Sequence, residues 1–314
     1  MDTINDMEKQ SKKRPPVIFE TVYQGDDSPD IASFLKKESP LSGRSLRQYF
    51  FKGLVRLNRK KAHSLAKLKS GDHLQVLGSN REHLVLKPEA LPLEVVYEDD
   101  RLLVINKPAL LAVHPSGGIT SGTLANGVAA YFQKNGLNIK VRPVNRLDYG
   151  TSGLIIFAKS PQSQMELSKA IQEHLVVRIY YAVVSGIPNA SEGIIKAPIM
   201  VDHKKRVVAE EGRQAETHYR VVKEFQNASL LELELRTGRT HQIRVHLNYI
   251  KTPIIGDTQY GIKSPVIKRP ALHAGKLIFR EPSLPLPELT APFPEDFQNL
   301  LETYIKKDRL ANRS

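Results

Sequence analysis

A short polar loop that leads into an unbroken apolar run is the feature that most constrains this chain. The run extends from Leu154 to Ala158, and the loop before it carries Asp148, Gly150 and Gly153. Glycine tolerates positive φ angles, so this spacing predicts a tight turn. A continuous apolar run of this length is typical of a strand buried on both faces. The sequence therefore predicts a carboxylate at the mouth of a core strand.

The residues around Asp148 suit an ionised and oriented carboxylate. Arg146 precedes it, and the hydroxyl groups of Thr151 and Ser152 follow it. A nearby cation and hydrogen-bond donors favour the charged form, which can act as a nucleophile or a base. An aspartate beside glycine is otherwise most often a turn residue that hydrogen-bonds its own backbone. Taken alone, the loop fits either a functional or a structural aspartate.

The segment Arg146 to Gly153 reads R-L-D-Y-G-T-S-G, which resembles the signature R-L-D-x-x-T-S-G. That signature belongs to the pseudouridine synthases of the class named for large-subunit ribosomal synthase A (RluA-like). The resemblance implies that Asp148 is the catalytic aspartate of an enzyme that isomerises uridine to pseudouridine within RNA, without a cofactor. Members commonly have His before the Arg, and this chain has Asn145, which must replace the contact of that His.

Two further segments resemble the same family. Arg178 to Gly186 is similar to its basic-x-Tyr strand, which places Tyr180 at the family's tyrosine. Thr237 to Leu247 is the second strong match, and the resemblance gives Arg239 the task of pairing with the catalytic aspartate. An Arg partner favours the ionised carboxylate. With weaker matches in order on either side, the resemblance covers about residues 93 to 297.

Several polar residues are candidates for binding substrate. Arg239 and Arg244 lie at the start of a predicted helix, whose free N–H groups suit a phosphate or a carboxylate. His241 and His246 are five residues apart with no Glu between them, so we expect no metal site. We expect Asp148, Tyr180 and Arg239 to be catalytic, and the substrate-binding candidates here to be Arg146, Thr151, Arg244 and, by resemblance alone, His114.

The charge balance favours a nucleic-acid partner. Lys and Arg number 46 against 33 Asp and Glu, which gives a net charge of +13. Between Gly43 and Lys69 there are nine basic residues and no acidic ones. The helix, helix, strand, turn, strand pattern of this region resembles a degenerate S4-type RNA-binding module, in which Arg47 and Arg56 are candidate RNA contacts. A basic but merely solvated surface is the alternative.

These patterns divide the chain into four parts and predict an α+β fold. We expect a small S4-like α/β module and a catalytic domain of pseudouridine synthase type with a mixed, mostly antiparallel sheet. The Pro-bearing linker Lys87 to Pro92 separates them. The predicted parts are a disordered lead at 1–16, the module at 17–90, the catalytic domain at 91–300 and a basic tail at 301–314.

The sequence also argues against several classes of protein. The amino terminus is acidic and lacks an apolar core, and Lys107 interrupts the most hydrophobic region, so we expect neither a signal peptide nor a membrane span. The absence of cysteine excludes disulfides, thiolate zinc sites and cysteine nucleophiles. We expect a cytoplasmic monomer that uses no cofactor.

Other functions compete with an active synthase. A non-catalytic RNA-binding or ribosome assembly protein could keep the same fold, with Asn145 as its only support. A retaining glycosidase needs two carboxylates about 5 Å apart, and only one acid lies within a motif here. An aspartic protease needs two Asp-Thr/Ser-Gly loops, and the chain has none. The intact set of Asp148, Tyr180 and Arg239 favours catalysis. Ribosomal RNA is the first expected substrate, and transfer RNA stays open.

Overall fold

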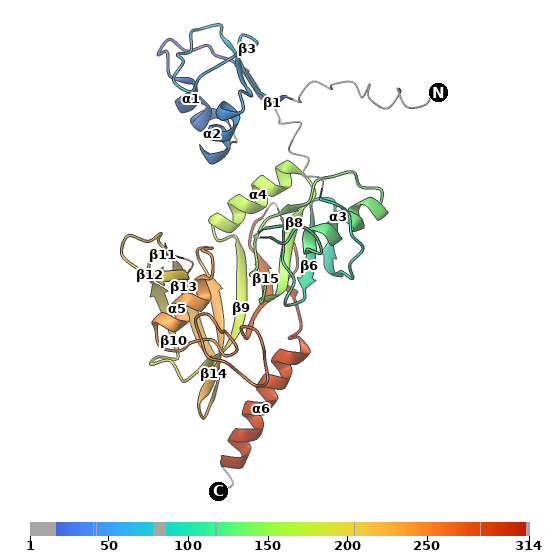
Figure 1. Ribbon diagram of the computed structural model, residues 1–314, viewed down its shortest axis with the longest axis vertical. Coiled ribbons are helices and arrows are strands. Elements are labelled where there is room, and N and C mark those ends of the chain that lie inside the picture. Colours follow the sequence, from blue (N-terminus) through green and yellow to red (C-terminus); the bar gives the residue numbers. More distant parts are fainter. Residues whose placement is uncertain are drawn as a thin grey trace. The chain divides into compact units, whose positions relative to one another are not determined.

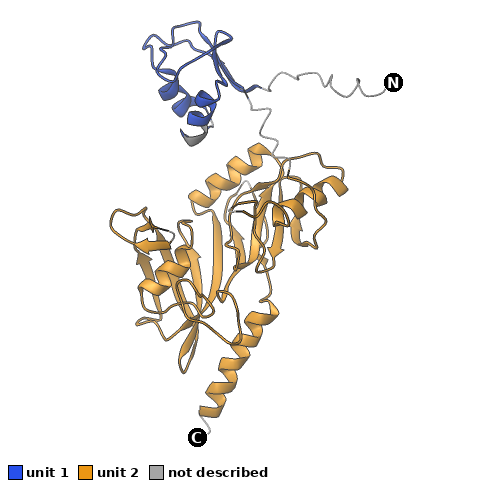
Figure 2. Ribbon diagram, viewed as in Figure 1, with its two compact units in different colours: residues 1–85 blue, residues 86–314 orange. Residues whose placement is uncertain are grey.

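The computed structural model describes residues 17–39, 41, 43–77, 86–116, 118–203, 205–282 and 284–311. They form two compact units, residues 1–85 and residues 86–314 (Figure 2). The division falls a few residues before the predicted boundary at 90/91. The predicted disordered lead at 1–16 lies outside the described residues.

The amino-terminal unit combines two short helices with a four-stranded antiparallel sheet of order β1-β4-β2-β3 (Figure 1). Asp30 caps the first helix because its side chain accepts a hydrogen bond from the backbone N–H of Ser33 at 2.8 Å. Ile31, Leu35 and Leu74 are fully buried between helices and sheet. The elements are β1 (Val17–Val22), α1 (Ile31–Glu38), α2 (Gly43–Phe51), β2 (Val55–Leu57), β3 (Lys60–Lys61) and β4 (His73–Leu77). Its S4-like identity stays a prediction.

The second unit is built on a ten-stranded sheet whose main path runs β10-β13-β14-β9-β15-β8-β6-β5. β16 pairs with β15, and β7 pairs with β8. Among the described pairings of this sheet, only that of β15 with β8 is parallel, which confirms the predicted mixed, mostly antiparallel sheet. The strands are β5 (Glu94–Glu98), β6 (Leu102–Lys107), β7 (Arg142–Pro143), β8 (Ser152–Ala158), β9 (Val176–Ser185), β10 (Glu192–Lys196), β13 (Glu216–Phe225), β14 (Ala228–Leu235), β15 (Leu272–Phe279) and β16 (Leu289–Thr290).

Helices cover both faces of this sheet. Successive residues of a strand point to opposite sides, so neighbouring residues of one strand pack against helices on different faces. Leu103 and Ile105 of β6 pack in one core with α3, α5 and α6, whereas Leu102 and Val104 pack in a second core with α4. A separate hairpin is formed by β11 (Ile199–Asp202) and β12 (Lys205–Val208). The helices are α3 (Leu124–Lys134), α4 (Pro161–Gln172), α5 (Gln242–Tyr249) and α6 (Glu295–Ala311). None of the helices in the described ranges is long and apolar enough to cross a membrane.

The predicted core strand is β8, and all seven of its residues are buried. It lies between β6 and β15, so both of its edges are paired. Asn145 stands just before the loop and is itself buried. Its Oδ1 accepts a hydrogen bond from the backbone N–H of Ile156 at 2.8 Å, and this bond ties the incoming chain to β8. Asn145 therefore supplies a structural contact at the position where the family commonly has His.

Most residues of the predicted basic tail, 301–314, belong to a helix. Residues 301–311 are the greater part of α6, which begins at Glu295. Phe297 and Leu300 of this helix are buried in the core that also contains Leu103 and Ile105 of β6. The rest of the predicted tail, 312–314, lies outside the described residues.

Gly153 is required at the start of β8. Its φ is +110°, and a Cβ atom added there would lie 2.2 Å from the carbonyl oxygen of Ala274 on β15. We predict that Gly153→Ala lowers the free energy of unfolding by at least about 3 kcal/mol, because backbone strain adds to a collision between backbones. Gly136→Ala is the control, since its φ is +73° but its surroundings are open. It should cost about 1 kcal/mol. Equal losses of unfolding free energy for the two variants in urea denaturation would contradict the predicted collision at Gly153.

Candidate active site

Asp148 lies in the loop between β7 and β8, at the mouth of the core strand as predicted. The backbone N–H of Thr151 donates to the carbonyl of Asp148 at 3.0 Å and closes the turn. The Asp148 side chain is 18% exposed and lines a cavity of about 370 Å³. Tyr180 of β9 and Arg244 of α5 line the same cavity. The fold therefore gives this carboxylate a partly sheltered cavity with access to a ligand.

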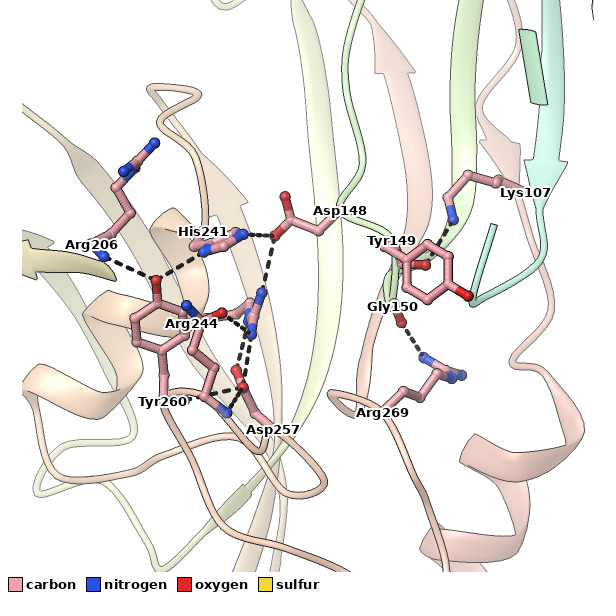
Figure 3. Close-up of polar contacts among 11 residues, drawn as sticks. Lys107, Asp148, Tyr149, Gly150, Arg206, His241, Arg244, Asp257, Tyr260 and Arg269 are labelled. Carbon is pink, nitrogen blue, oxygen red and sulfur yellow. Dashed lines mark hydrogen bonds and ion pairs between the residues drawn. The ribbon is translucent and has the colours of Figure 1, made fainter. Parts of the chain in front are cut away.

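The arginine that faces Asp148 is Arg244, not Arg239 as the sequence predicted. Nη1 of Arg244 lies 3.7 Å from Oδ2 of Asp148 (Figure 3). Nε and Nη2 of Arg244 bind the two carboxylate oxygens of Asp257 at 2.6 and 2.8 Å. The fork of the guanidinium is thus held by Asp257, and its remaining nitrogen is directed at Asp148.

The Arg244–Asp257 pair keeps its charges although it is buried. Burial opposes the charge of Arg244, but hydrogen bonding and attraction by Asp257 outweigh it and raise the pKa of Arg244. Burial likewise opposes the charge of Asp257, and the bonds from Arg244 outweigh it and lower the pKa of Asp257. The backbone N–H groups of Gln259 and Tyr260 also donate to Asp257, at 3.0 and 3.2 Å. A permanent cation therefore faces Asp148 at neutral pH.

His241 approaches Asp148 from the same side. Its Nε2 lies 3.9 Å from Oδ2 of Asp148, and its Nδ1 lies 2.9 Å from the hydroxyl of Tyr260 (Figure 3). Burial lowers the pKa of His241, so the neutral imidazole is favoured. A carboxylate favours the hydrogen on Nε2, and Nδ1 then accepts from Tyr260. Tyr260 in turn accepts from the backbone N–H of Arg206 at 3.0 Å.

Tyr180 forms part of the cavity wall from the adjacent strand β9. It is 4% exposed, and Tyr181 points to the opposite face, where its hydroxyl donates to Glu232 at 3.0 Å. Burial raises the pKa of Tyr180, so the phenol stays protonated at neutral pH. Arg178, two residues earlier on the same strand, also lines the cavity. Tyr180 can therefore offer a ring face or a hydroxyl hydrogen to a ligand, but not a tyrosinate.

The other predicted residues lie at different distances from the cavity. Arg146 is exposed and Thr151 is buried, and both line it. Arg239 is exposed on the rim, and its Nε donates to the carbonyl of Gln214 at 3.0 Å. His114 is exposed and is not part of the cavity wall. Two predicted residues, Arg47 and Arg56, belong to the amino-terminal unit.

Three residues of this site were not predicted from the sequence as functional. The sequence singles out His241 only as a rejected metal ligand, and Asp257 and Tyr260 lie within the weaker family matches that follow Leu247. The signal that could have found Asp257 is its position two residues after the buried pair Ile254–Ile255, because an acid there needs a buried partner. The αL conformation of His241, with φ 58°, has no sequence signal of its own.

Comparisons with known proteins agree on one family. A family model described as RNA pseudouridylate synthase matches residues 101–249. The chain is 38% identical over 295 residues to the uncharacterized RNA pseudouridine synthase YlyB of Bacillus subtilis, covering 91% of this chain and 97% of the relative. It is 41% identical to ribosomal large subunit pseudouridine synthase D of Xanthomonas campestris pv. campestris, covering 74% and 76%. The solved structure of human RNA pseudouridylate synthase domain containing 4 is similar, with a TM-score of 0.57 and 25% identity over 68% of this chain and 93% of that chain.

The buried pair should contribute strongly to stability. We predict that Asp257→Ala lowers the free energy of unfolding by about 3 kcal/mol, because it leaves the Arg244 guanidinium buried without its main partner. Arg220→Ala is the matched control, since it breaks a 2.9 Å pair with Glu232 whose Arg side chain is 57% exposed. Its cost should stay below about 1 kcal/mol. Similar losses of unfolding free energy for both variants in urea denaturation would show that breaking the buried pair costs no more than breaking an exposed one.

Proposed function

This chain belongs to the RNA pseudouridine synthase family, and from that premise we propose that its substrate is ribosomal RNA and that Asp148 is the catalytic carboxylate. Three relatives, from Pasteurella multocida, Xanthomonas campestris and Haemophilus ducreyi, are named ribosomal large subunit pseudouridine synthase D and are 36, 41 and 35% identical to this chain. The single observation that carries the assignment of Asp148 is its position in the cavity, facing a cation whose orientation Asp257 fixes.

The reaction sets clear demands on such a site. Isomerisation of uridine breaks the bond from ribose C1′ to N1 and forms one from C1′ to C5, with loss of the proton from C5 and gain of one at N1. A carboxylate must reach the sugar or the base, and the detached base must have room to turn. The cavity of about 370 Å³ is in the size range of sites that enclose small ligands. Since a base inside a helix cannot reach Asp148, the target uridine is unpaired or flipped.

The contacts of Asp148 suit a group that must react. Nη1 of Arg244 and Nε2 of His241 lie 3.7 and 3.9 Å from Oδ2, beyond hydrogen-bonding distance, and the other carboxylate oxygen points away from them in Figure 3. A cation thus faces the carboxylate, while neither of these nitrogens binds its oxygens tightly. Tyr180, protonated and in the same wall, is placed to stack on the uracil or to pass a proton to it.

Arg239 takes a different role in this proposal from the one that the sequence predicted. A further cavity of about 390 Å³, which shares Arg239 with the first, is also lined by Arg206 and Arg213, close to the turn that precedes α5. Two of these, Arg213 and Arg239, are exposed. Guanidinium groups bind phosphates as a fork. We assign Arg239 to the RNA backbone beside the flipped nucleotide and Arg244 to the carboxylate.

The amino-terminal unit is proposed to bind the same RNA. Arg47 is exposed on α2, and Arg56 lies on β2 within the stretch that carries nine basic and no acidic residues. Such a surface suits phosphate contacts that carry no sequence information of their own. The S4-like character of this unit, the cytoplasmic location and the monomeric state stay predictions.

Pseudouridine mapping tests the substrate and the carboxylate together. Total RNA from cells whose only copy carries Asp148→Ala should lack one or more pseudouridines of large-subunit ribosomal RNA, because the reacting group is gone while the RNA-binding surface is intact. Asp100→Ala is the control, since Asp100 is an exposed turn residue outside the cavity.

Two outcomes would contradict this proposal in different ways. Loss of pseudouridine from transfer RNA alone would remove ribosomal RNA as the substrate and leave Asp148 in its role. An unchanged map in the Asp148→Ala cells, with the variant present at normal level, would remove Asp148 from the chemistry.

A further inference from the structure

A second cavity adjoins the first at Asp148. It measures about 320 Å³ and shares three wall residues with the first cavity, namely Asp148, His241 and Arg244. Its other walls include Leu110, Tyr149 and Lys268. The two cavities therefore meet at the reacting carboxylate, and whatever occupies the second is adjacent to whatever occupies the first.

Tyr149 presents an exposed ring in this second cavity. Tyr149 is 54% exposed, although it follows Asp148 directly, and Leu110, which lines the same cavity, is 53% exposed. Leu110 also has a φ of 57°, which a leucine rarely adopts. Large apolar side chains exposed together beside a reaction centre are typical of a binding surface rather than of a solvated loop.

Two buried basic side chains donate hydrogen bonds to the backbone at Tyr149 and Gly150 (Figure 3). Nζ of Lys107, which is fully buried, donates to the carbonyls of Pro108 and Leu111 at 2.9 Å each and to that of Tyr149 at 3.4 Å. Lys107 therefore joins the loop of Asp148 to the loop that carries Leu110.

Arg269 holds the next residue of the same loop. Its Nη1 donates to the carbonyl of Gly150 at 3.2 Å, while Nε and Nη2 bind Asp296 of α6 at 2.7 Å each. A ring on a fixed backbone loses little conformational freedom when a ligand stacks on it. Tyr149 is thus pre-organised, in contrast to an aromatic residue on a mobile loop.

We propose that the second cavity is a subsite for the nucleotide next to the target uridine, and that Tyr149 is the platform on which its base stacks. This subsite rests on the proposed function. Bases of single-stranded RNA are recognised by stacking on aromatic side chains, and Tyr149 offers the ring that such a base needs. Lys268, exposed on the rim, is a cation for the phosphate of that nucleotide.

The occupant follows from continuity with the reaction centre. When the target uridine enters the cavity of Tyr180, the neighbouring nucleotide is within one phosphodiester link of the shared wall. A base left in water there would lose its own stacking partners in the RNA. Tyr149 replaces them, so the subsite favours RNA that is already unpaired on both positions.

The test uses the full chain and a synthetic RNA hairpin that spans the uridine located by pseudouridine mapping. Tyr149→Ala should lower kcat/KM by about 5-fold to 100-fold, mainly through KM, because one stacked base is lost. Tyr149→Phe should keep nearly the wild-type value, since the ring is retained. Tyr249→Ala is the matched control, because Tyr249 is 55% exposed and lines neither cavity.

A second arm replaces the base on the 5′ or the 3′ side of the target uridine by an abasic ribose. One of these replacements should lower kcat/KM of the wild type by a factor similar to that of Tyr149→Ala. The same replacement should have almost no effect on Tyr149→Ala, because the stacked pair is already broken. An unchanged kcat/KM for Tyr149→Ala, or an equal abasic penalty in both proteins, would overturn the subsite.

The two proposals fail in distinguishable ways. If the wild type forms pseudouridine in the hairpin and Tyr149→Ala matches it, only the subsite is wrong. If the wild type leaves every uridine of ribosomal and transfer RNA unchanged, the proposed function is wrong and the subsite falls with it.

Discussion

The buried ion pair between Arg244 and Asp257 is the interaction on which the site depends. A guanidinium that is mostly buried is costly unless it is paired, and Asp257 binds two of its nitrogens at 2.6 and 2.8 Å. That bidentate contact uses Nε and Nη2, so Nη1 is left in a fixed direction, 3.7 Å from Asp148. The helix α5 and the turn at Asp257 therefore determine the electrostatic environment of a residue more than 90 positions earlier in the chain.

A second set of contacts fixes the loop itself. Lys107 and Arg269 reach it from opposite sides and hold the carbonyls of Tyr149 and Gly150, while the N–H of Thr151 closes the turn on Asp148. Burial, followed by the charge of Arg269, lowers the pKa of Lys107 to about 7. The protonated ammonium has one hydrogen for each of its three carbonyl partners, whereas the neutral amine has two and would give up one contact. Positioning thus comes from buried donors, and the exposed surface is left free for RNA.

The sequence predicts the elements that have strong local signals, but it does not predict which residues far apart in the chain form pairs. The apolar run that becomes β8 and the alternation of β14 are each visible in a few residues. The arginine that faces Asp148 cannot be identified from a few residues in this way, because Arg239 and Arg244 are both basic and only five residues apart. The αL residue His241 turns the chain between them, so that Arg239 stays on the rim and Arg244 points inward. Asp257, which completes the pair, lies 13 residues after Arg244, in the turn that follows α5.

The measurement that tests this account most directly compares Arg244→Lys with Arg239→Ala in steady-state turnover of the same RNA. Lysine cannot bind Asp257 as a fork, so its charge no longer points at Asp148, and kcat should fall about 100-fold while KM changes little. Arg239→Ala should raise KM and leave kcat near the wild-type value, because it removes a phosphate contact. A large loss of kcat in Arg239→Ala together with normal kcat in Arg244→Lys would contradict the assignment of Arg244 to the carboxylate.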